Sequence, residues 1–290
     1  MDSENNFSLE TARQKFIQYL TEQRKAHATI LAYSKDIEQL VKFLEIAGKK
    51  TLSVVEKAEL EAFLKKLSAD GYTPKSLSRK INSIKTFYRF LKSQNLISAN
   101  PAAEINHPKY DIKPPRILSK MEYRALRDAC RSDARTYAIV ELFLQTGIRI
   151  GELANLKTLN VKERDLVVEA LEGHPERTVP LNKAAKTAID KWLSIRPQSD
   201  NTALFITKTG RPLLIRNIRT TIDRYFKIAG IENAKVNDLR HTFIAHHLAS
   251  GTPLTVISKL VGHKRLSTTE KYLDLIKDKT IQQYVKLDEL

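Results

Sequence analysis

The stretch LVGHKRLSTTEKYLDL, residues 260–275, places a histidine, His263, nine positions before a tyrosine, Tyr272. Two arginines stand in short motifs upstream: Arg149 in TGIRIGEL and Arg240 in VNDLRHTF. A tyrosine can act as a covalent nucleophile. A guanidinium can hold phosphate oxygens with paired hydrogen bonds and stays charged at any relevant pH. Together, these residues could break a phosphodiester bond without a cofactor, because they supply a nucleophile and positive charge for the transition state.

Each of these residues alone has an ordinary explanation. Arg149 could be a cation at the C-terminal end of a helix, which is a common placement. Arg240 could pair with Asp238 or Glu232 on the surface. The histidine and the tyrosine could be surface residues between two helices. Their joint occurrence favours the catalytic interpretation over four separate coincidences.

The charge balance points to a polyanionic partner. The 290 residues include 49 Lys and Arg against 33 Asp and Glu, which gives a formal net charge of +16 and a pI near 9.7. Nucleic acid is favoured over membrane, because no apolar run approaches the roughly 20 residues of a spanning helix. The acidic N-terminus, MDSENNFSLE, does not resemble a secretory signal. A single cysteine, Cys130, fits a reducing cytoplasm, and we expect it to be a small core residue on a helix.

Four helical segments are predicted in the first hundred residues. In the second, apolar residues recur at steps of three and four and Thr29 precedes them as a cap; the stripe comprises Ile30, Tyr33, Ile37, Leu40 and Leu44. A similar run covers residues 55–67. The fourth segment opens with Thr73 and Pro74, a cap followed by the proline that suits the first helical turn.

The fourth segment carries cations and no acid between Lys75 and Lys92. An uncompensated positive helix face suits phosphates better than it suits solvent alone. We therefore expect DNA contacts from Lys75, Arg79, Lys80, Lys85 and Arg89.

The chain divides into two domains around a proline-rich segment, residues 100–115. A capping box in SKME, with Ser119 and Glu122, predicts the first helix of the second domain. The strand-like stretches DLVVEAL (165–171) and ERTVPL (176–181) predict a hairpin, with LFIT (204–207) as a candidate third strand. The predicted fold is mainly α: an all-helical domain over residues 1–105, a linker at 106–117, and a helix-rich α+β domain with a small antiparallel sheet over 118–290.

The four boxes, in this order, resemble the tyrosine recombinase (lambda-integrase) family, most closely its compact Xer-type branch. LSRKINSIKTFYRFLKSQNLISANPAAEI, residues 77–105, resembles the end of the family's N-terminal core-binding (SAM-like) domain. The resemblance implies a site-specific recombinase that cleaves and rejoins DNA through a 3′-phosphotyrosyl intermediate. It also implies duplex DNA clamped between the two domains, paired inverted half-sites and an active tetramer. The implied residues are the nucleophile Tyr272, the phosphate-binding Arg149 and Arg240, the supporting Glu152, and His263, which supports the phosphate or helps to deprotonate the tyrosine.

Two positions depart from the family pattern. The family usually has a histidine three residues before its second arginine, where this chain has Asn237; the amide can still hydrogen-bond a phosphate but cannot exchange a proton. The family's general acid is a hairpin lysine, and the matching position, counted back from Arg177, is Glu172. An ionised glutamate would repel the departing alkoxide. Three explanations stay open: His174 supplies the proton, a lysine from elsewhere reaches in, or strand transfer is slow.

Other features limit the remaining function classes. No glycine-rich phosphate loop occurs, and His241, His246 and His247 lack zinc-ligand spacing, so we expect no cofactor and no metal. Core packing or solvent exposure would account for these three histidines. Ser267 and Glu270 predict a capping box before Tyr272, and residues 280–290 predict one more short amphipathic helix. The rival interpretations are a type IB topoisomerase and a non-catalytic DNA-binding relative.

Overall fold

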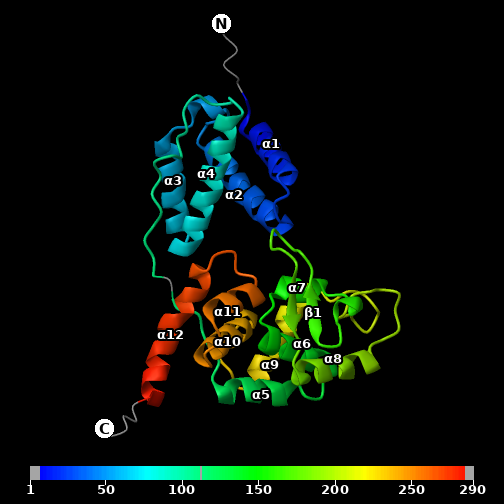
Figure 1. The fold of residues 1–290 in the computed structure, drawn as a ribbon. Helices are drawn as coiled ribbons and strands as arrows, with labels where there is room; N and C mark the ends of the chain where they lie inside the picture. The colour runs from blue at the N-terminus through cyan, green and yellow to red at the C-terminus, as the bar shows by residue number, and fades with distance from the viewer. Residues whose placement is uncertain (1–6, 112, 285–290) are drawn as a thin grey trace. The chain divides into compact units, whose positions relative to one another are not determined.

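A computed structural model of the chain describes residues 7–111 and 113–284, and their side chains except those of Ser53 and residues 277–284. The chain forms two compact units, residues 1–112 and 113–290 (Figure 1). The boundary lies within the segment expected to be a linker. The described elements are helices apart from one two-stranded antiparallel sheet. This confirms the predicted fold class.

The described part of the first unit consists of four helices around a core of mainly aliphatic side chains with several aromatic rings. They are α1 (Leu9–Glu22), α2 (His27–Ile46), α3 (Lys57–Ala69) and α4 (Pro74–Ser93), with a 3₁₀ turn at Leu52–Val54. Phe16 of α1 packs edge-on against Phe87 of α4, with ring centroids 5.3 Å apart.

The start of α4 is as the sequence predicts, but the start of α2 is not. The Thr73 hydroxyl accepts a hydrogen bond from the backbone N–H of Ser76, and Pro74 occupies the first turn. The cap expected at Thr29 is wrong, because α2 begins two residues earlier, at His27, and follows Ala26. An apolar stripe marks the buried face of a helix, and the backbone can extend beyond the stripe.

The second unit surrounds helix α6 (Ala134–Thr146), most of whose residues are buried. Its other helices are α5 (Lys120–Cys130), α7 (Ile150–Asn155), α8 (Lys183–Ile195), α9 (Ile215–Ile228), α10 (Val236–Ala249), α11 (Leu254–Leu260) and α12 (Ser267–Tyr284), with a 3₁₀ turn at Thr158–Asn160. The Ser119–Glu122 capping box is present at the start of α5, and Cys130 is buried at its end. Both features were predicted from the sequence.

The predicted hairpin is present, with β1 (Asp165–Val168) antiparallel to β2 (Arg177–Pro180). At its tip, Leu171 and His174 exchange backbone hydrogen bonds of 3.0 and 2.9 Å. The two residues between them, Glu172 and Gly173, both have positive φ, 50° and 75°. Such a pair is the signature of the tight turn that best fits the twist of two strands.

The third strand expected at residues 204–207 is wrong. This segment forms one isolated bridge in the described structure, Ile206 with Pro212, and does not join the hairpin. The Leu204 N–H donates to the Leu156 carbonyl at 2.7 Å, so its hydrogen bonds hold the turn after α7. A short apolar run bounded by polar residues predicts burial but does not specify a partner strand.

The C-terminal helix also differs from expectation. Ser267 is the first residue of α12, and the Glu270 N–H donates to the Leu266 carbonyl at 3.1 Å, so the expected Ser267–Glu270 capping box is wrong. Residues 280–284 continue α12 instead of starting a new helix, and residues 285–290 lie outside the described part. Each helix that the structure describes is too short or too polar to cross a membrane.

Candidate active site

The TGIRIGEL motif joins α6 to α7. Gly147 ends α6 in the left-handed conformation, with φ of 60°, and a Cβ at this position would lie 2.4 Å from the ring of Phe243. Only glycine meets both demands without strain. Arg149 is the N-cap residue of α7, and its backbone N–H donates to the Glu152 carboxylate at 2.7 Å. The motif therefore fixes where the Arg149 side chain starts.

Glu152 lies between two guanidinium groups. Its buried side chain accepts from Arg149 Nη1 at 2.8 Å and from both terminal nitrogens of Arg177 at 2.8 and 2.7 Å. Burial alone would raise the pKa of the Glu152 carboxyl, but the hydrogen bonds from Arg177 and Arg149 outweigh it, and the pKa falls to about 2. The carboxylate is thus ionised and holds Arg149 in one orientation.

Arg177 was not predicted as a site residue. Its Nε donates to the Leu260 carbonyl at 2.7 Å, and its guanidinium lies against Gly262, where a Cβ would be 2.9 Å from Nη1. Arg177 therefore joins the hairpin to the end of α11. One signal in the sequence could have found it: Arg177 stands two residues before the buried Val179, so both project from the same face of β2.

Arg240 is buried in the first turns of α10, with 6% of its surface exposed. It donates to the carbonyl of Gly147 and, at 2.7 Å, to that of Val261. Burial lowers the pKa of Arg240 to about 9, with a further decrease from Arg149, so the group remains a cation at neutral pH. The surface pairing considered for Arg240 is absent here, because Asp238 accepts from the Lys235 N–H at 2.8 Å instead.

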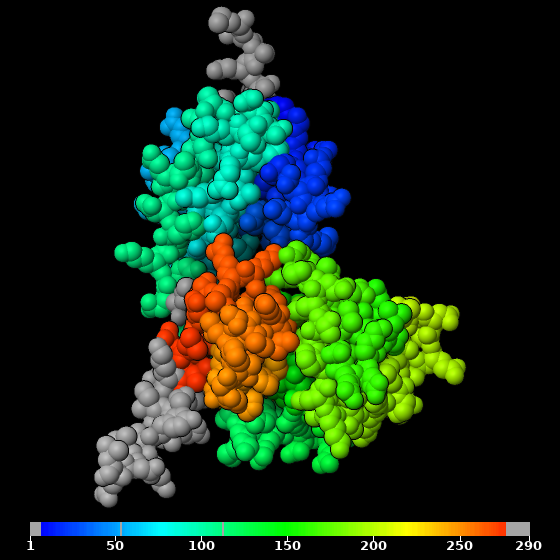
Figure 2. Space-filling model, in the orientation of Figure 1, coloured from blue at the N-terminus to red at the C-terminus, as the bar shows by residue number. Residues whose placement is uncertain are grey.

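Arg149 and Arg240 both bind the backbone directly before His263, the histidine of the LVGH motif. Arg149 Nη2 donates to the Gly262 carbonyl at 2.6 Å, and Arg240 binds the carbonyl one residue earlier. Figures 1 and 2 show this orange segment of the chain beside the green segment that carries α7 and the hairpin. Burial, Arg240 and Arg149 lower the pKa of His263 to about 4. The imidazole is therefore neutral near pH 7, and its Nδ1 shares a 2.7 Å hydrogen bond with Thr269.

Tyr272 lies in the first turns of α12 with only 5% of its surface exposed. Burial raises the pKa of its hydroxyl, and Arg240 partly opposes this. The hydroxyl shares a 2.6 Å hydrogen bond with Nδ1 of His241. Burial lowers the pKa of His241, which makes this imidazole neutral near pH 7. His241 was assigned to packing or solvent from the sequence, so its contact with the tyrosine was missed.

The remaining expected residues lie on α10 and at the tip of the hairpin. Asn237 is exposed, one helical turn before Arg240, and Glu172 is exposed at the hairpin tip. His174 is half-buried beside Glu172, and its Nδ1 has no hydrogen-bond partner among the described residues. The described residues also contain no group of three or more His, Cys, Asp or Glu side chains that could hold a metal ion.

Helix α4 of the first unit carries a second candidate surface. Lys75, Arg79 and Arg89 are exposed and Lys85 is half-buried, and their spacing places them on one broad face. The expectation that Lys80 belongs to this face is wrong. Lys80 is 4% exposed, and its ammonium donates to the buried Asp36 of α2 at 2.9 Å.

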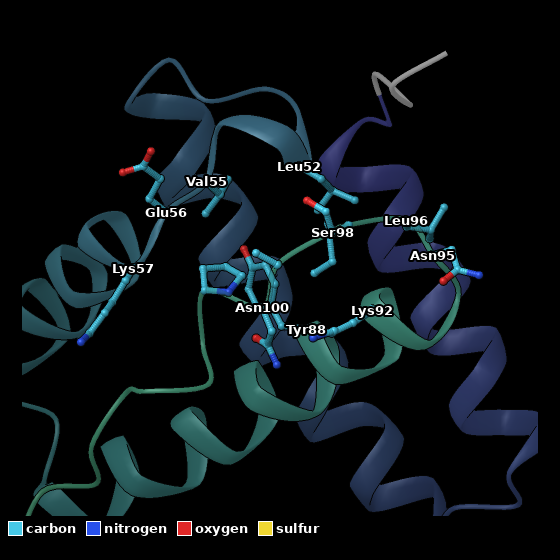
Figure 3. Close-up of a pocket in the computed structure, with 13 residues that line it drawn as sticks. Leu52, Val55, Glu56, Lys57, Tyr88, Lys92, Asn95, Leu96, Ser98 and Asn100 are labelled. Carbon is cyan, nitrogen blue, oxygen red and sulfur yellow. The ribbon is translucent and has the colours of Figure 1, made fainter. Parts of the chain in front are cut away.

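The first unit also contains a cavity of about 750 Å³, which none of the predicted site residues lines. Figure 3 shows Tyr88 and Lys92 from α4 on one side, and Leu52 and Val55 from the segment before α3 on the other. The hydroxyl of Tyr88 is buried and has no hydrogen-bond partner within the described residues. Burial raises the pKa of this hydroxyl.

Comparison with known families agrees with this geometry. Residues 116–279 match the phage integrase family, and residues 14–95 match the N-terminal SAM-like domain of phage integrases. The chain belongs to the phage integrase family. These matches cover the segments that carry α4 and the two arginines, the histidine and the tyrosine described above.

Relatives of this integrase-family chain are similar over almost their full length. A tyrosine recombinase XerC from Thermodesulfovibrio yellowstonii is 33% identical, over 89% of this chain and 89% of the relative. A XerC from Alcanivorax borkumensis is 31% identical, over 95% of this chain and 92% of the relative. The chain is thus a tyrosine recombinase of the Xer-like type, an enzyme that cleaves and rejoins DNA through a covalent tyrosine intermediate.

Solved structures of other integrase-family proteins share the fold. The XerA recombinase is 26% identical and superposes with a TM-score of 0.55, over 97% of this chain and 100% of that one. A lambda integrase dimer bound to a core site is 19% identical, with a TM-score of 0.75, over 90% of this chain and 97% of that one. This likeness supports a helical N-terminal unit followed by a catalytic-type unit with a small sheet.

Proposed function

We propose that this Xer-like recombinase cleaves DNA with Tyr272 as the nucleophile, and Arg149, Arg240 and His263 around the scissile phosphate. One observation carries the proposal. Arg149 donates to the carbonyl of Gly262 and Arg240 donates to the carbonyl of Val261. These are the two residues directly before His263. Three groups that can bind a phosphate are therefore held together by one short segment, and α12 follows with the tyrosine.

The chemistry requires a negative phosphorane to be stabilised. The Tyr272 oxygen attacks phosphorus, a phosphotyrosyl bond forms at the 3′ end, and the bond to the 5′ oxygen breaks. Each guanidinium offers paired donors to the non-bridging oxygens. Loss of either one is expected to cost about 3 to 4 kcal/mol of transition-state stabilisation. The neutral imidazoles of His241 and His263 are potential acceptors for the tyrosine proton.

Six further residues have supporting roles in the proposal. Glu152 positions Arg149 without contacting DNA, because its carboxylate is buried between two guanidinium groups. Asn237 is exposed one turn before Arg240 and is proposed to hydrogen-bond the phosphate backbone. Lys75, Arg79, Lys85 and Arg89 on α4 are proposed to bind phosphates of the duplex.

The proposed substrate is duplex DNA with paired inverted half-sites, and the proposed active assembly is a tetramer in the cytoplasm. The net charge of +16 supports a polyanionic partner. A structure of similar fold is a lambda integrase tetramer bound to a Holliday junction, 20% identical with a TM-score of 0.74. Two-fold related half-sites suit a protein that acts as paired copies, because each copy then makes the same contacts.

Trapping of the covalent intermediate tests the proposal. The preferred duplex is first selected from random DNA, and a nick near the cleavage point then lets the cut strand diffuse away. The native chain is expected to accumulate a protein–DNA adduct, and Tyr272→Phe is expected to bind the same duplex without forming one. An adduct in Tyr272→Phe would refute the assignment of the nucleophile, and no adduct from the native chain would favour a non-catalytic DNA-binding protein.

A second assay separates recombination from relaxation. A type IB topoisomerase relaxes supercoiled plasmid without any target site. This chain is expected to leave such a plasmid supercoiled and to recombine a plasmid that carries two selected sites. Relaxation of the plasmid without a site would instead favour the topoisomerase interpretation.

A further inference from the structure

The tip of the β1–β2 hairpin meets the loop that follows His263. Lys264 is the next residue in that loop, and its Nζ lies 3.2 Å from the position that a Cβ would occupy on Gly173. The glycine, with φ of 75°, leaves room for the ammonium group directly over the turn. Lys264 thus reaches from the α11–α12 loop to the hairpin.

The hairpin tip that Lys264 reaches also lies close to Arg149 and Arg177. His174, next to Gly173, is affected electrostatically by both Arg149 and Lys264. The two cations are therefore within electrostatic range of one imidazole, and one of them is a proposed phosphate ligand. The Lys264 side chain is exposed, so a DNA strand can approach it.

We propose that Lys264 donates the proton to the 5′ oxygen that leaves when the strand is cut. This step rests on the proposed function of Tyr272 and its neighbours. The bond from the tyrosine oxygen to phosphorus forms while the bond from phosphorus to the 5′ oxygen breaks, and the latter electron pair stays on that oxygen. The Lys264 ammonium transfers a proton to it and becomes a neutral amine. In rejoining, the amine takes the proton back from the 5′ hydroxyl.

The neighbouring groups are weaker donors for this step. Glu172 is an exposed carboxylate, and a negative charge there opposes the charge that develops on the oxygen. Burial, Arg149 and Lys264 lower the pKa of His174 below its ordinary 6.5, so the imidazole is neutral near pH 7. Arg149 is held by Glu152 and by the Gly262 carbonyl, in the position proposed for binding the non-bridging oxygens. An alkylammonium releases a proton far more readily than an alcohol does.

A substrate with sulfur in place of the leaving 5′ oxygen tests the proposal, because a thiolate departs without a proton. Adduct formation is measured in single turnovers at saturating protein on nicked oxygen and sulfur substrates. We expect Lys264→Ala to cut the oxygen substrate about 10² to 10⁴ times more slowly than the native chain. On the sulfur substrate we expect the native rate.

Two further variants separate proton donation from charge and from folding. Lys264→Arg keeps the charge but is expected to stay slow on the oxygen substrate and fast on the sulfur one. Arg265→Ala removes the adjacent exposed cation and is expected to cut both substrates at rates near native. His174→Ala is expected to show no selective rescue by sulfur.

Four results would overturn the assignment: native speed of Lys264→Ala on oxygen, equal slowing on both substrates, restored activity in Lys264→Arg, or selective sulfur rescue of His174→Ala. Equal slowing would make Lys264 a DNA-binding residue. Absence of an adduct from the native chain on either substrate is a different result, since it refutes the proposed function of Tyr272 itself.

Discussion

Replacement of Arg177 by methionine tests whether the buried carboxylate of Glu152 organises the arginine cluster. Methionine keeps a long apolar side chain but removes two hydrogen bonds to Glu152 and one to the Leu260 carbonyl. Glu152 would stay buried with Arg149 as its remaining charged partner. Leaving a buried charge without one of its partners costs about 3 to 5 kcal/mol. We expect the lower value, about 3 kcal/mol, because Arg149 and its backbone N–H still bind the carboxylate.

The pH dependence of this loss carries the sharper test. The Glu152 pKa is depressed in the folded chain, from an ordinary 4.5 to about 2, which corresponds to roughly 3 kcal/mol of stability. Because the folded-state pKa is the lower one, this contribution is fully present above about pH 4.5 and is lost as the pH falls toward 2. Without Arg177, burial raises the pKa again. The free-energy difference between native chain and variant should therefore shrink below pH 4.5.

Urea unfolding followed by circular dichroism at several pH values between 7 and 3 measures this difference. Lys186→Met provides the control, since it breaks a partly exposed surface ion pair with Asp190 and should cost less than about 1 kcal/mol. A loss in Arg177→Met that stays constant from pH 7 to pH 3 would refute the role of Glu152. A loss below 1 kcal/mol at neutral pH would refute the burial argument.

Three other predictions use the same measurements or a binding titration. Gly147→Ala should lower the free energy of unfolding by about 1 to 3 kcal/mol, because the new Cβ would clash with the Phe243 ring and because alanine disfavours the left-handed backbone conformation at this position. Unchanged stability in urea would contradict this. Arg89→Ala should reduce the slope of log affinity against log salt by about one, whereas Lys80→Met should leave the slope unchanged and lower stability instead. Tyr88→Phe should leave the free energy of unfolding unchanged or raise it by up to about 3 kcal/mol, since it removes a buried hydroxyl without a hydrogen-bond partner among the described residues. A clear decrease of this free energy in urea would indicate that solvent in the cavity hydrogen-bonds the hydroxyl.

Features that depend on neighbours in the chain could be predicted from the sequence. The Thr73 and Ser119 caps, the proline at the start of α4 and the β1–β2 hairpin are all encoded within a few residues. Local backbone hydrogen bonds decide such features, so local patterns can indicate them. The same kind of pattern gave wrong starts at Thr29 and Ser267, because helices α2 and α12 begin at other residues than the caps predict. The roles of Arg149 and Arg240 were predicted differently, from the resemblance of their motifs to those of the recombinase family.

Features that depend on a second element could not be read in this way. Asp36, on another helix, forms ion pairs with both Lys80 and Arg79, but only the Lys80 side chain is buried with it. A count of charges along α4 therefore overstates the positive face, because it includes a lysine whose charge is already paired in the core. The contact of His241 with Tyr272 has the same character, since it joins α10 to α12.

The proposed role of Lys264 illustrates how a hairpin motif that lacks the family's lysine can still be accompanied by a lysine from another loop. The family pattern places the lysine on the hairpin itself, and the residue at that position is Glu172. Proton transfer depends on where an ammonium lies relative to the leaving oxygen, and not on which segment carries it. Two loops meet at the hairpin tip, and the turn of Glu172 and Gly173 leaves space over the glycine for a side chain from the other loop. A lysine next to His263 can then occupy the place that the hairpin leaves open.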